Sequence, residues 1–389
     1  HYLFNPQARE FPALKEEDFT VRDLNVGLWT NFAKTGNPTS SDDFGFQWTP
    51  FDPDQPEYLN INTNPVMQYS EEFRRRRDFW ESLVPPRPLV VAPAGAVLGI
   101  WGKSEQGATY QSYRGIPFGQ VVKRFEAPAP VEPWGDDVLE ALKEGAVCPQ
   151  LPNKATIEAN GMSEDCLFLN VFVPGNNMEA SGLPVMVFVH GGGYVAGSGG
   201  NFYYGPEFLM DEDIILVTIN YRLGALGFLG LGNPTAPGNT ALWDQHLALT
   251  WVQNNIEAFG GDPARVTLAG ESAGSFSVMY HLVSPRERGL FSGIIAQSGA
   301  PFSTYPELSI LARPEKPRKV ATALANNFGC DTSSDEALLS CLREQSWEDI
   351  VSTDVFCQNV TIGTVNPWNA VVDSYLEDPF LPETPSSIA

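Results

Sequence analysis

The sequence predicts an α/β fold with a mostly parallel central sheet and helices on both faces. Three segments of strand length are predicted at 185–189, 214–219 and 265–269, and the first two carry the apolar runs that are typical of strands buried on both faces. Helical segments at 242–259 and 275–282 alternate with them. Strands that alternate with helices form parallel sheets, because each crossover returns the chain to the same edge.

The first part of the chain, residues 1–83, is organised differently. An amphipathic run that ends at the helix breaker at 36–38 (GNP) predicts a helix, with apolar residues at Val21, Leu24, Leu28, Trp29 and Phe32. A short strand is predicted at 58–61, and a second helix closes on Phe79 and Trp80. The arginines at 74–77 lie among acidic residues, so we interpret them as a solvated helix face rather than a binding patch.

A proline-rich segment separates this part from the rest. Residues 84–93 include the sequence PPRP and predict a stiff, extended linker between residues 1–83 and a second domain at 94–389. The chain begins with His1 rather than methionine and shows no signal-peptide pattern, so we expect a fragment or a processed product.

Composition argues against several partners. The 47 acidic residues against 24 basic ones give a net charge of −23, which repels phosphate backbones, so nucleic acid is not expected to bind. No stretch reaches the roughly 20 apolar residues that span a bilayer, so no membrane span is expected. Because no cluster of His, Cys and Asp has ligand spacing, neither a metal nor an organic cofactor is expected.

Cysteine spacing bears on the compartment. Two pairs could each close a local disulfide, namely Cys148 with Cys166 and Cys330 with Cys341. Cys357 is left over and is expected to be buried and inert. Together with a glycosylation sequon at Asn359, the pairs favour a secreted protein, whereas the alternative is five reduced core thiols in a cytosolic one.

Candidate chemistry lies at the ends of two predicted strands. Strand 185–189 runs into His190 and three glycines, where the missing side chains leave backbone N–H groups free to face a ligand oxygen. Strand 265–269 runs into 270–274 (GESAG) and then a helix, which is the order of a nucleophile elbow. Ser272 is therefore the candidate nucleophile for attack on an acyl carbonyl, the alternative being a glycine turn with a structural serine.

These motifs together resemble the type-B carboxylesterases, which include cholinesterases, insect juvenile-hormone esterases and the non-catalytic neuroligins. The resemblance rests on residues 113–118 (YRGIPF), 164–171 (EDCLFLNV), 190–193 (HGGG), 220–222 (NYR), 244–245 (DQ), 259–263 (FGGDP), 270–274 (GESAG) and 297–299 (QSG). It implies an α/β-hydrolase fold and a serine carboxylic ester hydrolase that acts through an acyl-Ser272 intermediate. It also places the oxyanion hole at the N–H groups of Gly192, Gly193 and Ala273, and it matches both cysteine pairs to the family's disulfides.

The order of the chain differs from that of the family. Residues 28–38 (LWTNFAKTGNP) resemble a segment that normally follows the catalytic histidine. We therefore expect 1–83 to be the C-terminal segment of one esterase module and 94–389 the N-terminal portion of another, with a neighbouring module in the same polypeptide as partner. The sheet is then incomplete at the edge that carries the triad acid and histidine. The alternative is a complete, rearranged and inactive protein.

None of the four histidines is expected to act as the general base. His1 lies just beyond the position of the family's histidine, and His190 has a structural role in the family. His246 lies within a predicted helix, where a packed histidine is the simpler interpretation. His281 shares the predicted helix of Ser272 but faces the opposite side, about 13 Å along the axis. The chain alone is expected to be inactive or weakly active.

The sequence restricts the substrate only in part. Residues 149–165 contain no aromatic side chain, whereas cholinesterases place an aromatic platform there, so choline esters are not expected. Tyr194 is the candidate pocket wall, with plain packing as the alternative. Ser298 either supports the triad acid in complete relatives or has a cap role. A neuroligin-like binding module is the alternative function, and the retained Ser272 argues against it.

Overall fold

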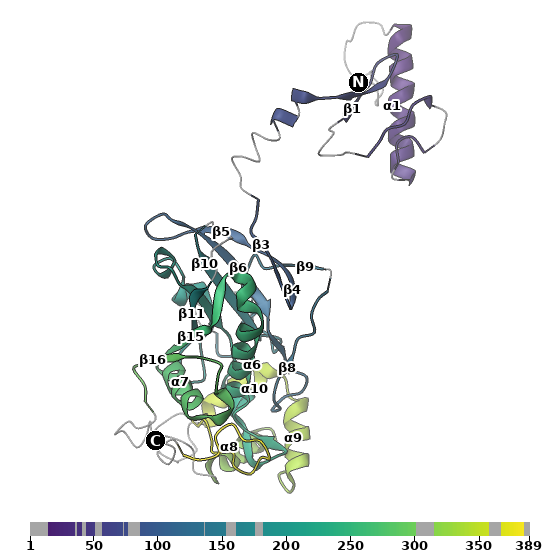
Figure 1. Cartoon of the computed structure of the whole chain (residues 1–389). Coiled ribbons are helices and arrows are strands. Elements are labelled where there is room, and N and C mark those ends of the chain that lie inside the picture. Colours follow the sequence, from purple (N-terminus) through teal and green to yellow (C-terminus); the bar gives the residue numbers. More distant parts are fainter. Residues whose placement is uncertain are drawn as a thin grey trace. The chain divides into compact units, whose positions relative to one another are not determined.

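The computed structural model describes residues 15–384 apart from 36, 41–43, 51–56, 73, 77–85, 136, 153–160, 176–181, 301–314 and 358–366 (Figure 1). The chain divides into two compact units, His1–Pro86 and Arg87–Ala389. Their boundary falls within the predicted linker. Each unit is described by itself below.

The first unit contains one long helix and a hairpin. Helix α1 (Glu16–Thr35) confirms the predicted helix, and β1 (Glu57–Asn60) pairs antiparallel with β2 (Val66–Tyr69). Leu28 is fully buried, but Trp29 and Phe32 are 60% and 58% exposed, so the described residues of this unit cover only part of the apolar face.

In the arginine run, Arg75 and Arg76 are exposed and Arg74 is half-buried, while Arg77 lies outside the described residues. Arg74 pairs with Glu71 and Arg76 with Glu72, each at 2.8 Å, along a short helical stretch. These pairs agree with a solvated helix face. Phe79 and Trp80, the predicted end of this helix, lie outside the described residues.

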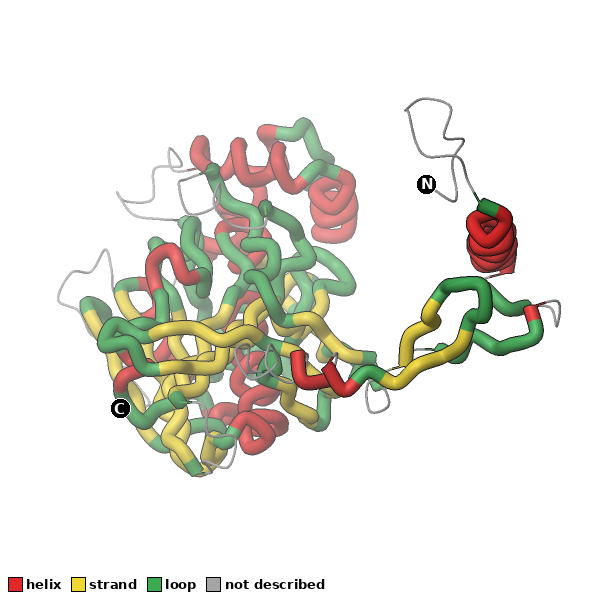
Figure 2. The backbone as a smooth tube through the Cα atoms, turned by 90° about the horizontal axis from the view of Figure 1, so that it is seen from above, coloured by secondary structure: helices red, strands yellow, loops and turns green. Residues whose placement is uncertain are grey.

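The second unit is built on a seven-stranded sheet in the order β16-β15-β11-β12-β10-β6-β5. Figure 1 labels most of these strands, and Figure 2 shows the strands in yellow. Its strands are β5 (Ile100–Lys103), β6 (Thr109–Pro117), β10 (Phe168–Pro174), β11 (Leu183–Val189), β12 (Ile215–Ile219), β15 (Gly261–Glu271) and β16 (Gly293–Gln297). The four neighbours β12, β11, β15 and β16 are parallel, and β10, β6 and β5 extend the sheet antiparallel. Among the described strands, β16 is an edge.

Side-chain alternation along these strands creates two apolar layers. In β12, Ile215 and Val217 face the main core, whereas Leu216 faces the other side. Helices α6 (Thr240–Asn255) and α7 (Ala273–Val283) supply residues to the main core. Among the described residues, the opposite face carries the short α4 (Asn201–Tyr204) and the 3-10 helix η3 (Leu209–Asp211), whose Met210 packs against Leu216. Helices therefore cover both faces, as predicted, but unequally.

Smaller elements complete this unit. Three minor sheets comprise β3 (Leu89–Ala92), β4 (Gly95–Leu98) and β9 (Val138–Glu140); β7 (Gly119–Gln120) and β8 (Ala129–Pro130); and β13 (Gly230–Asn233) and β14 (Ala236–Pro237). The remaining helical elements are α5 (Gly224–Phe228), η4 (Ile256–Phe259), η5 (Pro285–Glu287), α8 (Glu315–Asn327), α9 (Asp335–Glu344) and α10 (Trp347–Cys357).

The predicted linker at 84–93 is wrong in its second half. Leu89–Ala92 form strand β3, which pairs antiparallel with β4. Val90 and Ala92 are buried while Leu89 and Val91 are exposed, which is the alternation of a half-buried strand. The prolines at 85–88 predict an extended linker, and the period-two pattern that follows them is only four residues long.

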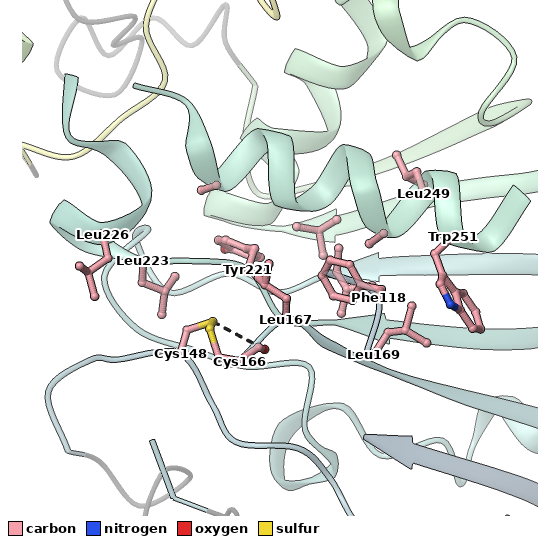
Figure 3. Close-up of a cluster of buried hydrophobic side chains, with 14 of the residues drawn as sticks. Phe118, Cys148, Cys166, Leu167, Leu169, Tyr221, Leu223, Leu226, Leu249 and Trp251 are labelled. Atoms are coloured by element: carbon pink, nitrogen blue, oxygen red, sulfur yellow. Dashed lines mark hydrogen bonds between the residues drawn. A yellow bond between two sulfur atoms is a disulfide. The ribbon is translucent and has the colours of Figure 1, made fainter. Parts of the chain in front are cut away.

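Both predicted disulfides are present. Cys148 bonds to Cys166 and Cys330 to Cys341. Figure 3 shows the first bond inside a buried apolar cluster, near Leu167 and Tyr221, where it closes the loop between the two cysteines against the core. The side chain of Cys357 and the whole of Asn359 lie outside the described residues. Within the described part of the chain, no helix is long and apolar enough to cross a bilayer.

Candidate active site

Ser272 occupies a sharp turn between β15 and α7. Its backbone has φ 54° and ψ −119°, a conformation that residues with side chains rarely adopt and that surrounding structure must hold in place. The Ser272 N–H donates to the carbonyl of Gln297 at 2.9 Å, so the end of β16 fixes the turn. The strand, strained turn and helix of a nucleophile elbow are therefore observed.

Glycines make this turn sterically feasible. A Cβ on Gly270 would lie 2.5 Å from the carbonyl carbon of Gly274, and a Cβ on Gly274 would lie 2.0 Å from the carbonyl oxygen of Val189. Both contacts are with backbone atoms, which cannot rotate away. The GESAG pattern is thus explained by close approach of β11, β15 and α7.

The glycine loop after β11 passes directly beside the candidate nucleophile. A Cβ on Gly191 would lie 3.1 Å from the Cβ of Ser272. Gly192 and Gly193 both have positive φ, 110° and 63°. The N–H of Ala196 donates to the carbonyl of Gly192 at 3.1 Å, which closes the loop into a tight turn.

The third predicted oxyanion donor lies on the other side of the elbow. Ala273 is the first residue of α7, and N–H groups in the first turn of a helix have no partner within the helix. They also lie at the positive end of the helix dipole, which favours a negatively charged ligand. The predicted donors Gly192, Gly193 and Ala273 therefore belong to two segments that converge at Ser272.

His190 is packed into the core. It is 1% exposed, stacks on Tyr221 at 4.2 Å, and its Nδ1 lies 2.8 Å from the carbonyl of Gly191. Burial lowers the pKa of His190 to about 4, so the ring is neutral at pH 7. The hydroxyl of Tyr221 donates to the His190 carbonyl at 2.7 Å, which anchors the start of the glycine loop. This geometry agrees with a structural role.

Tyr194 is packed in the core. It is 3% exposed, its ring packs 4.6 Å from that of Phe228, and its hydroxyl accepts a hydrogen bond from Ser277 at 3.3 Å. These contacts agree with the packing alternative, and a role in substrate binding stays a prediction. Its positive φ of 63° turns the side chain inward, which the sequence around it did not signal.

An apolar cavity of about 110 Å³ borders the residues that follow Tyr194. Val195 and Ala196 line it from the glycine loop, and Leu223, Leu226 and Trp368 line it from other segments. Because the N–H of Ala196 donates to the Gly192 carbonyl, the cavity wall and the glycine loop belong to one hydrogen-bonded turn.

Gln150 is a site residue that sequence reasoning missed. Its side-chain amide donates to the Gly197 carbonyl at 2.8 Å and accepts from the Gly197 N–H at 2.9 Å. This two-bond link ties the disulfide loop to the glycine loop. No motif in the sequence marks Gln150, because its partner is distant along the chain.

Segment 297–299 supports the elbow through its backbone. The Gln297 carbonyl accepts from Ser272, and the Gly299 carbonyl accepts from the hydroxyl of Ser275 at 2.6 Å. Ser298 is exposed and has φ 59°.

His246 and His281 converge on Glu287, away from the elbow. Nδ1 of His246 lies 2.9 Å from one carboxylate oxygen of Glu287, and Nδ1 of His281 lies 3.2 Å from the other. Burial alone would raise the pKa of Glu287, but His281 and His246 outweigh it and lower the pKa to about 2. His281, near the C-terminal end of α7, is fully buried.

This cluster predicts a loss of stability in acid. Glu287 has a folded-state pKa of about 2, below its usual 4.5, so the unfolded chain binds more protons between these values. The stabilisation is complete above about pH 4.5 and disappears as the pH falls towards 2. We expect denaturant titrations between pH 6 and 2 to show a shallower pH dependence for Glu287→Gln than for the unmodified chain. Identical slopes would contradict this. Glu140→Gln, at an exposed position on β9, is the matched control and should keep the original slope.

Comparison with known proteins identifies related chains. A model of the carboxylesterase family matches residues 1–80 and 86–389. Juvenile hormone esterase of Tribolium castaneum is 42% identical over 312 residues, covering 77% of this chain and 52% of that protein. Venom carboxylesterase-6 of Apis mellifera is 37% identical, covering 77% of this chain and 53% of that protein.

Solved structures agree with this result. The crystal structure of juvenile hormone esterase from Manduca sexta, with OTFP covalently attached, is similar with a TM-score of 0.71 and 33% identity. The match covers 78% of this chain and 57% of that one. This chain spans about half the length of the curated relatives it matches.

Proposed function

The chain belongs to the carboxylesterase family, and on that premise we propose that it carries the nucleophile of a serine carboxylic ester hydrolase. The observation that supports this most is the strained backbone of Ser272, which lies against the glycine loop. In the proposed reaction the Ser272 hydroxyl attacks the ester carbonyl, and the alcohol leaves to give an acyl-serine. Water then releases the acid. The N–H groups of Gly192, Gly193 and Ala273 bind the oxyanion, each contributing about 3 kcal/mol to lowering the barrier.

We further propose that none of the chain's histidines is the base for Ser272. His190 is buried and stacked on Tyr221, and His246 and His281 are bound to Glu287. His1 lies outside the described residues. In well-studied serine proteases, loss of the histidine lowers turnover by about 10⁶. The chain alone should therefore hydrolyse esters only in traces.

The proposed substrate is an uncharged ester with an apolar group. The cavity beside the glycine loop is lined by apolar side chains such as Leu223, Leu226 and Trp368, which favour a hydrocarbon portion. The similarity to juvenile hormone esterases supports this choice. Residues 149–165 contain no aromatic platform for a cationic alcohol.

We also propose that 1–83 is the C-terminal segment of one module and that the second unit, Arg87–Ala389, is the N-terminal portion of the next. The exposed Trp29 and Phe32 on α1 agree with a helix whose partner is not among the described residues of its unit.

The two disulfides support secretion, because such bonds persist in oxidising compartments.

Covalent labelling tests the nucleophile assignment. The full chain is incubated with a fluorophosphonate, and the adduct is followed by intact mass and located by peptide mapping. We expect slow labelling at Ser272, because the elbow is present but a base is not, and none in Ser272→Ala. An adduct elsewhere, or one that survives Ser272→Ala, would contradict the nucleophile. Rapid stoichiometric labelling would instead contradict the missing base.

A further inference from the structure

A chain of buried polar contacts connects the His281 region to the glycine loop. Nε2 of His281 lies 2.9 Å from Oε1 of Gln245, Nε2 of Gln245 donates to the Ser277 hydroxyl at 3.3 Å, and that hydroxyl donates to the Tyr194 hydroxyl at 3.3 Å. We call these four residues the relay. All four are buried, with exposures of 3% or less.

The relay ends beside the proposed oxyanion hole. Tyr194 follows Gly193 directly, and its backbone has a positive φ of 63° that only its surroundings can maintain. Its carbonyl accepts from the N–H of Gly224 at 2.7 Å, and its ring packs on Phe228. The Ser277 bond therefore fixes the hydroxyl end of a side chain whose backbone continues the glycine loop.

The partners of His281 define the direction of the hydrogen bonds. The Gln245 carbonyl oxygen can only accept, so Nε2 of His281 donates to it. On the other side of the ring, Nδ1 lies 3.2 Å from a carboxylate oxygen of the buried Glu287. Gln245 then has its amide N–H groups free for Ser277, and Ser277 keeps its own proton for Tyr194.

The other groups around His281 do not compete for this role. From α6, His246 binds the second carboxylate oxygen of Glu287; from the C-terminal segment, the uncharged Phe380 ring packs 5.2 Å away. Arg286 lies over Trp243 and pairs with Asp378. Within the described residues no group of His, Cys, Asp and Glu is arranged to hold a metal ion, this cluster included.

We propose that His281 is a positioning residue for the oxyanion hole, acting through Gln245, Ser277 and Tyr194 to hold the glycine loop in place. This inference rests on the proposed esterase function for its catalytic meaning. His281 touches no reacting atom. Its effect would reach Ser272 only through the position of the N–H groups at Gly192 and Gly193.

The test uses Ser277→Ala in the full chain, because it removes one hydroxyl from the relay and leaves the His281–Glu287 pair intact. Hydrogen exchange of the peptide over 190–197 should become about 3- to 10-fold faster, consistent with loss of one buried hydrogen bond. In fluorophosphonate labelling, the maximal rate at Ser272 should fall by a similar factor, while the half-saturating concentration stays unchanged. Ser277→Thr, which restores the hydroxyl, should recover both values.

Two controls separate positioning from general loosening. Ser284→Ala removes another buried hydroxyl at the end of α7, which donates to the Phe380 carbonyl, and should leave loop exchange unchanged. Gln245→Leu should speed loop exchange and slow labelling as much as Ser277→Ala does. The double variant should show no larger change than either single variant, because both substitutions interrupt the same path. Equal loop exchange in Ser277→Ala and Ser284→Ala, or additive effects in the double variant, would overturn the proposal. If no variant were labelled at Ser272, that result would contradict the esterase function but not the relay. The relay is tested independently by hydrogen exchange of the peptide over 190–197.

Discussion

Replacing Gly274 with alanine is expected to destabilise the second unit by about 3 kcal/mol or more and to abolish labelling of Ser272. The added methyl group would lie 2.0 Å from the Val189 carbonyl oxygen and 2.8 Å from that of His190. Relief requires α7 to move away from β11, and that movement would separate the Ala273 N–H from the glycine loop. Denaturant unfolding measures the stability, and intact mass after fluorophosphonate treatment measures the reactivity.

Gly293→Ala is the matched control for this prediction. Gly293 begins β16 beside the elbow strand, but its added Cβ would meet only the Thr267 hydroxyl, at an ordinary 3.7 Å. We expect a change within about 0.5 kcal/mol and unchanged labelling. If Gly274→Ala were as mild as Gly293→Ala, the close approach of β11 and α7 would not be what fixes the elbow.

The parts of the fold that could be predicted are those determined by residues that are close together in the sequence. Apolar runs identified β11 and β12, and β15 was identified by the elbow motif that follows it. The turn at Ser272 could be predicted because glycines on both sides are needed where backbones meet. Both disulfides could be predicted because their cysteines are close in sequence.

The parts that could not be predicted depend on contacts between distant segments. Tyr194 was assigned to a pocket wall by its neighbours in sequence, yet Ser277 and Phe228 place it in the core. Gln150 and Glu287 stand in no motif, and their partners on other elements give them their roles. The amphipathic pattern of α1 correctly predicted a helix. It could not predict which segment covers the apolar face, because the pattern depends only on the residues of the helix itself.

Replacing Arg222 with methionine is expected to lower the free energy of unfolding by about 3–5 kcal/mol. The guanidinium is 3% exposed and binds both oxygens of Asp244, which is fully buried, and it also donates to the Glu126 carbonyl at 2.8 Å. Without Arg222 the Asp244 carboxylate stays buried with no cation. Arg222 directly precedes Leu223, which lines the cavity, so the loss should also loosen the proposed substrate pocket. Denaturant unfolding and hydrogen exchange of residues 223–229 report the two effects.

A second substitution distinguishes the buried charge from lost packing. Asp244→Asn added to Arg222→Met removes the uncompensated carboxylate, so the double variant should be more stable than Arg222→Met alone. Arg318→Met, which breaks the half-exposed pair with Asp335, should cost about 1 kcal/mol or less because solvent screens that pair. If the double variant lost as much as the sum of its single changes, the damage would come from packing around the Arg222 side chain. In that case the Arg222 side chain would support the cavity wall by packing rather than by its charge. Its loss would then affect substrates according to the size of their apolar groups, and not all substrates equally.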